Sequence, residues 1–168
     1  MGNWNKKSLF LCKKCYLIVN SITEKEFLML KGIPEIIPPE LLKILAEMGH
    51  GDEIVISDAH FPAYSISDKV VHVGSVPSPE MLKAILKLME LDQYVEKPVM
   101  LMQVVPGDEA DPEFLDEIHS VLGKDSSRIE YIERFAFYER AKRSYAVAVT
   151  GEKRKYGNII VKKGVTLP

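Results

Sequence analysis

Hydrophobic positions along this chain follow two alternating patterns, one typical of helices and the other of strands. Apolar residues three or four positions apart predict helices that begin at Pro38-Pro39, Ser78-Pro79 and Asp111-Pro112, and a further helix over 135–143. Short apolar and β-branched runs predict strands over 53–57, 70–73, 98–105, 129–132, 146–150 and 158–161. Because the two kinds of element alternate, we expect an α/β domain with helices on both faces of one sheet.

The apolar run over 98–105 is continuous, which is typical of a strand covered on both faces. The last two predicted strands are separated only by a polar loop over 151–157. A connection of this length permits an antiparallel pair, so we expect a sheet that is not wholly parallel.

The first 28 residues differ from the rest of the chain in charge and in cysteine content. They hold five lysines and two glutamates, a local charge of +3, so the other 140 residues carry −5 of the total charge of −2. Cys12 and Cys15 are the two cysteines of the chain and form a lone CxxC, which is weak evidence for metal or redox chemistry. We expect residues 1–28 to be a basic extension, or to follow an upstream translation start, and the domain to occupy 29–168.

Composition excludes some classes of function. An acidic domain lacks the basic excess of a nucleic-acid binder, and no run of 18 apolar residues is long enough to span a membrane. The chain contains no GxSxG, GxGxxG or GxxxxGK[ST] motif, so no nucleophile elbow and no nucleotide site is indicated. We expect no cofactor.

One polar cluster follows the first helix and contains His50, Asp52, Asp58 and His60. Asp58 and His60 come just after a buried strand, where open α/β sheets bind ligands. Three interpretations remain open: a metal site that uses these four residues, acid–base catalysis by His50, and a simple role for His50 at the helix C-terminus. The metal reading is weakened because no HxH or HExxH spacing is present.

A second polar cluster lies in the last third of the chain. Arg134, Tyr156 and Asn158 supply directional donors and acceptors of the kind that bind a polyhydroxylated ligand. The aromatic residues Phe135, Phe137 and Tyr138 offer ring faces that sugars favour. The alternative is a solvated helix with surface ion pairs, followed by an ordinary turn.

Four separated segments resemble the L-fucose mutarotase family, whose sister is D-ribose pyranase. These are Leu41–Ile54 (LLKILAEMGHGDEI), Ser57–Ala63 (SDAHFPA), Arg134–Arg140 (RFAFYER) and Lys155–Asn158 (KYGN) with the following VKKG. The similarity runs from residue 29 to the C-terminus. It implies a three-layer α/β/α domain with a mixed, mostly parallel sheet, assembled in ring-shaped decamers with sites near subunit contacts.

The resemblance also assigns roles to individual residues. His50 matches the catalytic histidine of the family, Asp58 a sugar-binding aspartate, and Arg134 a substrate-contacting arginine where the ribose branch usually has histidine. The triplet of Tyr156, Gly157 and Asn158 matches the binding residues of the last loop. The implied reaction interconverts the α and β anomers of L-fucose without metal or cofactor, with Tyr156 a candidate partner of His50 in proton transfer.

Other functions remain open beside this one. They are pyranase activity on D-ribose or another monosaccharide, a non-catalytic sugar-binding module, and a metal-dependent isomerase or lyase using His50, Asp58 and His60. Since sugar catabolism is an intracellular task, and the apolar run over 8–19 is interrupted by lysines, a cytoplasmic location is expected.

Overall fold

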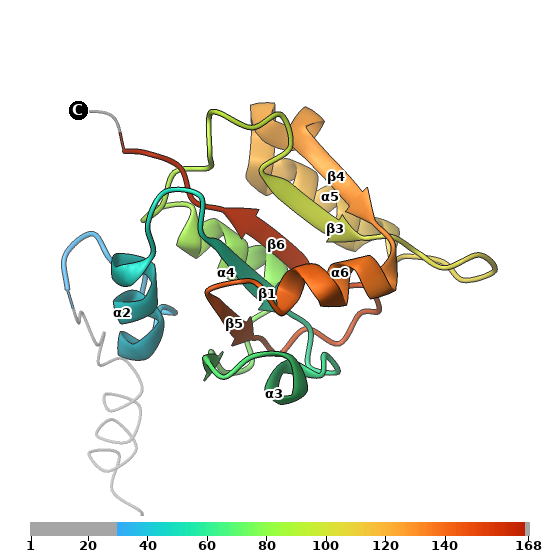
Figure 1. Cartoon of the computed structure of the whole chain (residues 1–168), viewed down its shortest axis with the longest axis horizontal. Coiled ribbons are helices and arrows are strands. Elements are labelled where there is room, and N and C mark those ends of the chain that lie inside the picture. Colours follow the sequence, from blue (N-terminus) through green and yellow to red (C-terminus); the bar gives the residue numbers. More distant parts are fainter. Residues whose placement is uncertain (1–29, 167–168) are drawn as a thin grey trace, which may run out of the picture. The chain divides into compact units, whose positions relative to one another are not determined.

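Six short strands form one sheet in the computed structural model, which describes residues 30–166 (Figure 1). The strands are β1 (Glu53–Ser57), β2 (Val70–His72), β3 (Val99–Met102), β4 (Ile129–Ile132), β5 (Ala146–Val149) and β6 (Ile159–Lys162). The helices are α2 (Pro39–Glu47), α3 (Ala63–Ile66), α4 (Ser78–Ile85), α5 (Pro112–Leu122), the 3-10 turn η1 (Gly123–Arg128) and α6 (Arg134–Ala141). All of them belong to the unit Gly32–Pro168.

The strand order is β2-β5-β1-β6-β3-β4. The pairs β1–β5, β2–β5 and β3–β4 are parallel, whereas β6 lies between β1 and β3 and runs antiparallel to both. The expectation of a mixed sheet is therefore confirmed, but the antiparallel pair of the last two strands that the loop length permits does not form. The loop over 151–157 carries the chain past β1, so β5 and β6 are separated by a strand instead of forming a hairpin.

Each face of the sheet is covered by its own helices, which makes the three layers expected for the fold. Alternate residues of β1 show the division, because Ile54 and Ile56 pack in one core cluster and Val55 packs in the other. The larger cluster contains the apolar faces of α2, α4 and α5, and the smaller one contains Phe137 and Ala141 of α6 with Ala63 of α3. All four residues of β3 are buried, in agreement with its continuous apolar run.

Several predicted boundaries shift by a few residues. The strand expected over 98–105 ends at Met102, and the helix that begins at Ser78 ends at Ile85, before Leu88 and Met89. Tight turns follow this helix, with the Lys87 N–H donating to Ala84 O and the Leu88 N–H to Ile85 O. Met89, which follows these turns, is still buried, so the apolar periodicity continues beyond the helix itself.

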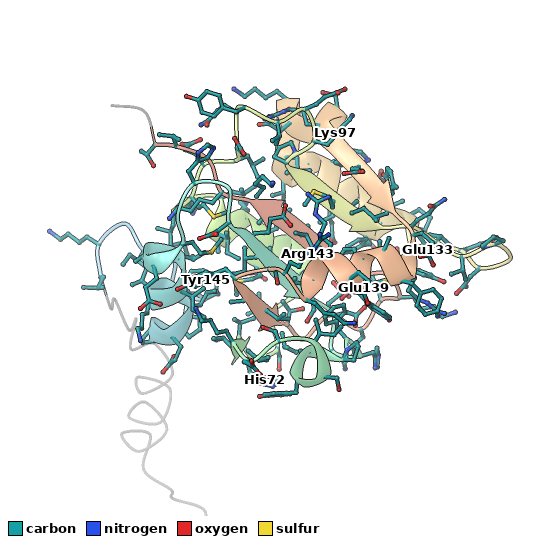
Figure 2. All side chains as sticks on the ribbon, in the orientation of Figure 1. His72, Lys97, Glu133, Glu139, Arg143 and Tyr145 are labelled. Carbon is teal, nitrogen blue, oxygen red and sulfur yellow. The ribbon has the colours of Figure 1, made fainter. Side chains whose placement is uncertain are left out.

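Carboxylates stabilise the beginnings of two helices. Asp111 accepts hydrogen bonds from the N–H groups of Glu113 and Phe114, and Glu133 accepts from those of Phe135 and Ala136. The Glu133 cap fixes where α6 begins, directly after β4 (Figure 2), and so fixes the position of Arg134.

The basic extension expected over 1–28, with Cys12 and Cys15, lies outside the described residues. Within 30–166, no helix combines the length and the apolar character needed to cross a membrane.

Candidate functional site

Asp58 and Asn158 meet at one edge of the sheet. We call this the carboxyl edge, where β1, β3, β4 and β5 end and β6 begins (Asp58, Met102, Ile132, Thr150, Asn158). The Asn158 Nδ2 donates to Asp58 Oδ2 at 2.6 Å, and the Asp58 N–H donates to Asn158 Oδ1 at 3.0 Å. Both residues are buried. Burial raises the pKa of the Asp58 carboxyl, although hydrogen bonds from the His60 N–H and from Asn158 act in the opposite direction.

Gly157 is required by close packing beside this pair. A Cβ at this position would lie 2.6 Å from Glu152 Cγ, 3.1 Å from Arg154 O and 3.3 Å from Asp58 Cβ. The Gly157 carbonyl accepts a 2.8 Å hydrogen bond from the buried Ser78 hydroxyl. The last loop is therefore pressed against Asp58, and only glycine allows that approach.

Tyr156 has a backbone conformation that non-glycine residues seldom adopt, with φ of +61°. Its hydroxyl donates a 2.9 Å hydrogen bond to Asp108 Oδ2, and Lys155 Nζ lies 3.1 Å from Asp108 Oδ1. The Glu109 N–H, the Tyr156 hydroxyl and Lys155 together lower the pKa of Asp108. Strained backbone of this kind persists where surrounding contacts hold it, and it is concentrated at functional sites.

Arg134 is the first residue of α6, next to the end of β4. Strand β3 lies between β6 and β4, so the end of β4 is roughly 10 Å from Asn158 at the usual strand spacing, and Arg134 follows it by two residues. Its guanidinium lies 4.7 Å from the centroid of the exposed Phe135 ring. Phe137 is one of the three aromatic residues expected to offer a ring face to a sugar. It cannot do so, because it is fully buried in the core below α6.

His50 lies at the opposite edge of the sheet. This amino edge is where β1 and β3 begin and β6 ends (Glu53, Val99, Lys162). The His50 Nε2 is 3.2 Å from Asp92 Oδ1, and its ring makes an edge contact with Tyr94, with centroids 5.4 Å apart. Gly51, with φ of +87°, makes the turn from His50 into β1.

The proposed role of His50 as a cap of α2 is wrong. Lys163 does this instead, because its Nζ donates to Leu45 O at 2.8 Å and to Met48 O at 2.6 Å. The His50 ring contacts Asp92 instead of the helix.

The length of β1 separates His50 from Asp58. The four residue steps of this strand alone span roughly 13 Å, so the two side chains belong to different ends of the molecule. The alternative metal site built from His50, Asp52, Asp58 and His60 of one chain is therefore geometrically impossible. Within the described residues, no three His, Cys, Asp or Glu side chains are grouped so that they could hold a metal ion.

Two carboxylates that contact candidate residues were not singled out from the sequence: Asp92, which contacts His50, and Asp108, which contacts Tyr156. Asp92 meets a partner 42 positions away and Asp108 one 48 positions away, so neither has a local spacing signal. The one available indication is the Pro106-Gly107-Asp108 turn, which marks a loop without indicating its partner.

A family model matches residues 31–166 of this chain, and its description is the RbsD / FucU transport protein family. The chain belongs to the RbsD/FucU family. Within it, the chain is 57% identical over 142 residues to an L-fucose mutarotase of Actinobacillus pleuropneumoniae serotype 5b (strain L20), covering 82% of this chain and 98% of that protein. It is 51% identical, with the same coverage, to an L-fucose mutarotase of Haemophilus influenzae (strain PittGG).

Solved structures of this RbsD/FucU family share the fold. The fucose mutarotase of Streptococcus pneumoniae in complex with L-fucose superposes with a TM-score of 0.78 at 46% identity, covering 82% of this chain and 100% of that one. Bacillus subtilis RbsD complexed with D-ribose has a TM-score of 0.63 at 26% identity, covering 77% and 95%. The fold expectation is thus confirmed, and this chain is more similar to the fucose protein than to the ribose protein.

Proposed function

We propose that this chain is an L-fucose mutarotase, which interconverts the α and β anomers of L-fucose by opening and closing the sugar ring. The observation that carries the proposal is the buried, mutually hydrogen-bonded pair of Asp58 and Asn158 beside the strained Tyr156. Such a group of directional donors and acceptors suits sugar hydroxyls. The choice of fucose is supported by relatives that carry this activity in their names at 51–57% identity.

The reaction needs two proton transfers and no redox step. The anomeric hydroxyl loses its proton and the ring oxygen gains one while the C1–O5 bond breaks, which leaves an open-chain aldehyde. Rotation about C1–C2 presents the other carbonyl face, and closure reverses both transfers. General acid–base catalysis contributes about 10²–10⁴ to the rate of such steps, and positioning of the sugar adds to it.

Each candidate side chain has a role in this scheme. His50 protonates the ring oxygen or accepts the anomeric proton, and Tyr156 carries out the complementary transfer. Asp58, Arg134 and Asn158 hold sugar hydroxyls, while Gly157 allows the last loop to approach Asp58.

Two copies of the chain are needed to bring these residues to one sugar. His50 lies at the amino edge and the other five residues at or near the carboxyl edge, so one chain presents half a site at each end. We propose a closed homo-oligomer, a decamer by the resemblance, in which the amino edge of one copy faces the carboxyl edge of the next. Such a head-to-tail contact generates a ring when the rotation from one copy to the next closes. A cytoplasmic location suits this step of sugar catabolism.

Magnetisation exchange between the α- and β-anomer signals of L-fucose in NMR tests the activity. Added protein is expected to raise the exchange rate above the spontaneous rate, and the His50→Ala variant is expected to abolish most of that increase. Sugar affinity measured by calorimetry without any added exchange would establish a non-catalytic binding module instead. The same measurement with D-ribose distinguishes the pyranase alternative.

A mixing experiment tests the shared site. His50→Ala and Asn158→Ala are each expected to be inactive alone, but co-expressed subunits would rebuild intact sites wherever the two unmutated halves meet. Random assembly of equal amounts restores about a quarter of the wild-type rate, because each of the two halves is intact in half of the contacts. Complete absence of recovery in mixed oligomers would overturn the shared site.

A further inference from the structure

We propose that Arg154 is a positioning residue of the sugar site, because its ion pair with Glu152 ties the last loop to α5. The loop is thereby held in the form that places Tyr156 and Gly157 at the carboxyl edge before a sugar arrives. This inference rests on the proposed function and deepens it, since Arg154 acts through the candidate binding residues and is not one of them.

Glu152 is a buried carboxylate at the start of the last loop. Its side chain is 4% exposed, and its Oε1 accepts hydrogen bonds from the Lys153 N–H and the Arg154 N–H, each at 2.9 Å. Burial alone would raise the pKa of Glu152, but the hydrogen bonds from Arg154 and Lys153 outweigh it, and the pKa is lowered. The chain over 152–154 is therefore wrapped around one ionised carboxylate.

The Arg154 side chain closes the same turn and connects it to a helix. Its Nε donates to Glu152 Oε1 at 3.0 Å and its Nη2 to Glu152 Oε2 at 2.8 Å, a two-point contact with a defined direction. The same Nη2 donates to Glu117 Oε2 at 2.9 Å, and the guanidinium carbon lies 5.1 Å from the centroid of the buried Phe114 ring. Glu117 and Phe114 belong to α5, so Arg154 fastens the last loop to that helix.

Glu152 also touches both segments of the proposed sugar site. Its carbonyl accepts a 2.9 Å hydrogen bond from the N–H of Ala59, the residue after Asp58. Its Cγ is an atom against which Gly157 packs, since a Cβ at Gly157 would lie only 2.6 Å away. Release of the Glu152 side chain would therefore loosen the contact between the last loop and Asp58.

The backbone of Tyr156 is the strained part that this arrangement must hold. Its φ of +61° lies in the left-handed region, which a tyrosine adopts only where surrounding contacts fix it. Arg154 lies two positions before Tyr156 and Gly157 directly after it, so Glu152 holds the chain on both sides. A loop released from α5 would relax from this conformation and move the Tyr156 hydroxyl, the candidate for the second proton transfer.

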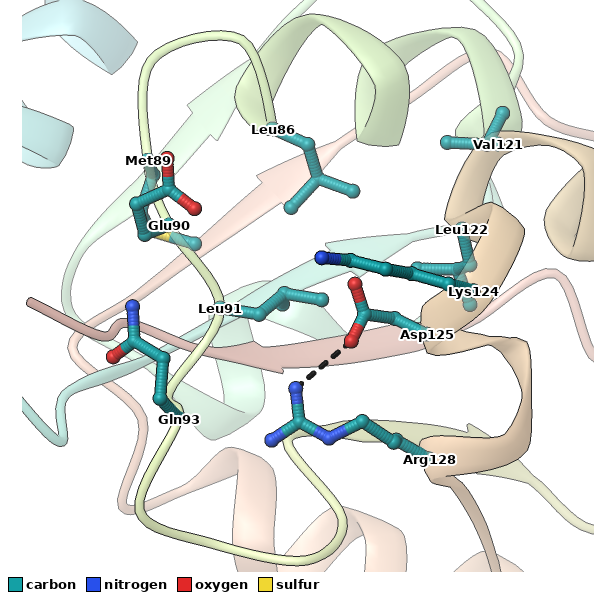
Figure 3. Close-up of a pocket in the computed structure, with 10 residues that line it drawn as sticks. All are labelled: Leu86, Met89, Glu90, Leu91, Gln93, Val121, Leu122, Lys124, Asp125 and Arg128. Atoms are coloured by element: carbon teal, nitrogen blue, oxygen red, sulfur yellow. Dashed lines mark hydrogen bonds and ion pairs between the residues drawn. The ribbon is translucent and has the colours of Figure 1, made fainter. Parts of the chain in front are cut away.

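Asp125 and Arg128 of η1, just after α5, supply a matched control. Arg128 Nη1 donates to Asp125 Oδ1 at 2.9 Å beside a cavity of about 250 Å³ (Figure 3). The Arg128 side chain is 26% exposed and that of Arg154 22%, so the two guanidinium groups have similar surroundings. Asp125 is more buried than Glu117, so Asp125→Asn should affect stability at least as much as Glu117→Gln.

The kinetic test measures L-fucose exchange in these variants. We expect Arg154→Met to lower the rate about 10- to 100-fold, the scale of the loss when a reacting group is displaced. Glu117→Gln should cause a smaller loss, and as a change at a half-exposed side chain it keeps the test valid if Arg154→Met does not fold. Asp125→Asn should keep the wild-type rate. A wild-type rate in folded Arg154→Met, or equal losses in Glu117→Gln and Asp125→Asn, would overturn the proposal.

A mixing experiment separates positioning from a general loss of stability. Co-expression of Arg154→Met with His50→Ala should restore about a quarter of the wild-type rate, because the two changes lie in different halves of the shared site. Co-expression with Asn158→Ala should add nothing to the residual rate, since both changes damage the same half. Recovery with Asn158→Ala, or none with His50→Ala where His50→Ala and Asn158→Ala restore each other, would overturn the role of Arg154.

Deuterium exchange of backbone amides tests the same role without enzyme activity. We expect peptides covering 151–158 to exchange at least about tenfold faster in Arg154→Met than in the wild type, while peptides of β1 and β3 keep the wild-type rate. Unchanged exchange in the last loop, or faster exchange throughout the sheet, would contradict the inference. Absence of fucose exchange in the wild type, together with the expected deuterium pattern, would instead overturn the proposed function and leave the anchoring of the loop by Arg154 intact.

Discussion

Asp58 and Asn158 hold each other through two hydrogen bonds, of 2.6 and 3.0 Å, although one hundred positions separate them in the chain. One residue follows β1 and the other precedes β6, so the antiparallel pairing of these two strands brings them together. Their polar groups satisfy each other in a buried setting. The pair therefore links the stability of the fold to the proposed sugar site.

Asn158→Ala removes both hydrogen bonds and leaves a buried carboxyl without its amide partner. We expect the free energy of unfolding to fall by roughly 2 kcal/mol, the cost of an unsatisfied buried polar group, and fucose exchange to be lost. Thermal unfolding and anomer exchange in NMR measure the two effects. An Asn158→Ala protein that retains wild-type exchange would remove Asn158 from the site.

Tyr156→Phe removes the hydroxyl that donates to Asp108 at 2.9 Å. Because this hydroxyl is the candidate for the second proton transfer, we expect the exchange rate to drop at least about tenfold, with little change in melting temperature. Tyr145→Phe is a matched control, since its hydroxyl also donates to a carboxylate, that of Glu47, at 3.1 Å. Equal rates in both variants would exclude proton transfer by Tyr156.

Gly157→Ala introduces a methyl group 2.6 Å from Glu152 Cγ. Either Glu152 or the last loop must move, and overpacking of this kind destabilises by about 1–3 kcal/mol. We expect a lower unfolding temperature and weaker fucose binding in calorimetry. Gly49→Ala serves as the stability control, because a Cβ there meets Asp52 Oδ2 only at 3.7 Å. Similar destabilisation in both variants would mean that the close approach at Gly157 has no special cost.

We expect the stability of the fold to decrease in acid because of the ion pair between Glu53 and Arg140. Burial alone would raise the pKa of Glu53, but the two hydrogen bonds from Arg140, of 2.8 and 3.0 Å, and the nearby Lys162 outweigh it and lower the pKa. A carboxyl with a lowered folded-state pKa stabilises the fold above its unfolded-state pKa. That stabilisation is lost as the pH falls through the folded-state value.

Glu53→Gln should therefore reduce the melting temperature at neutral pH and flatten its decline in acid. Melting curves from pH 7 to pH 3 measure both effects. Glu130→Gln is the control, since this exposed carboxylate lies 3.5 Å from Arg140 and should change the profile little. A profile of Glu53→Gln parallel to that of the wild type would show that other carboxylates govern acid unfolding.

Most of the elements could be predicted from the sequence, because helix and strand periodicity is a local property. The start of α2 at its prolines and the burial of β3 on both faces are examples, and both agree with the structure. The order of the strands in the sheet could not be predicted from local periodicity. Proximity in the chain favoured pairing of β5 with β6, whereas the packed sheet places β1 between them.

The candidate site could be predicted in its members but not in its arrangement. Asp58, Arg134, Tyr156, Gly157 and Asn158 were singled out, and the structure brings all five to or near one edge. The sequence analysis also placed His50 in the same cluster as Asp58, because only eight positions separate them in the chain. An extended strand carries residues apart at about 3.3 Å per step, and so the two lie at opposite edges.

By itself, then, the sequence determined the kinds of element, the two buried faces and the family to which the chain belongs. Only the tertiary structure decided that β6 is inserted between β1 and β3, that Asp92 is the partner of His50, and that the proposed sugar site is divided between two edges. Local patterns reflect backbone periodicity and burial, whereas contacts across 42 or 100 positions depend on how the strands are ordered.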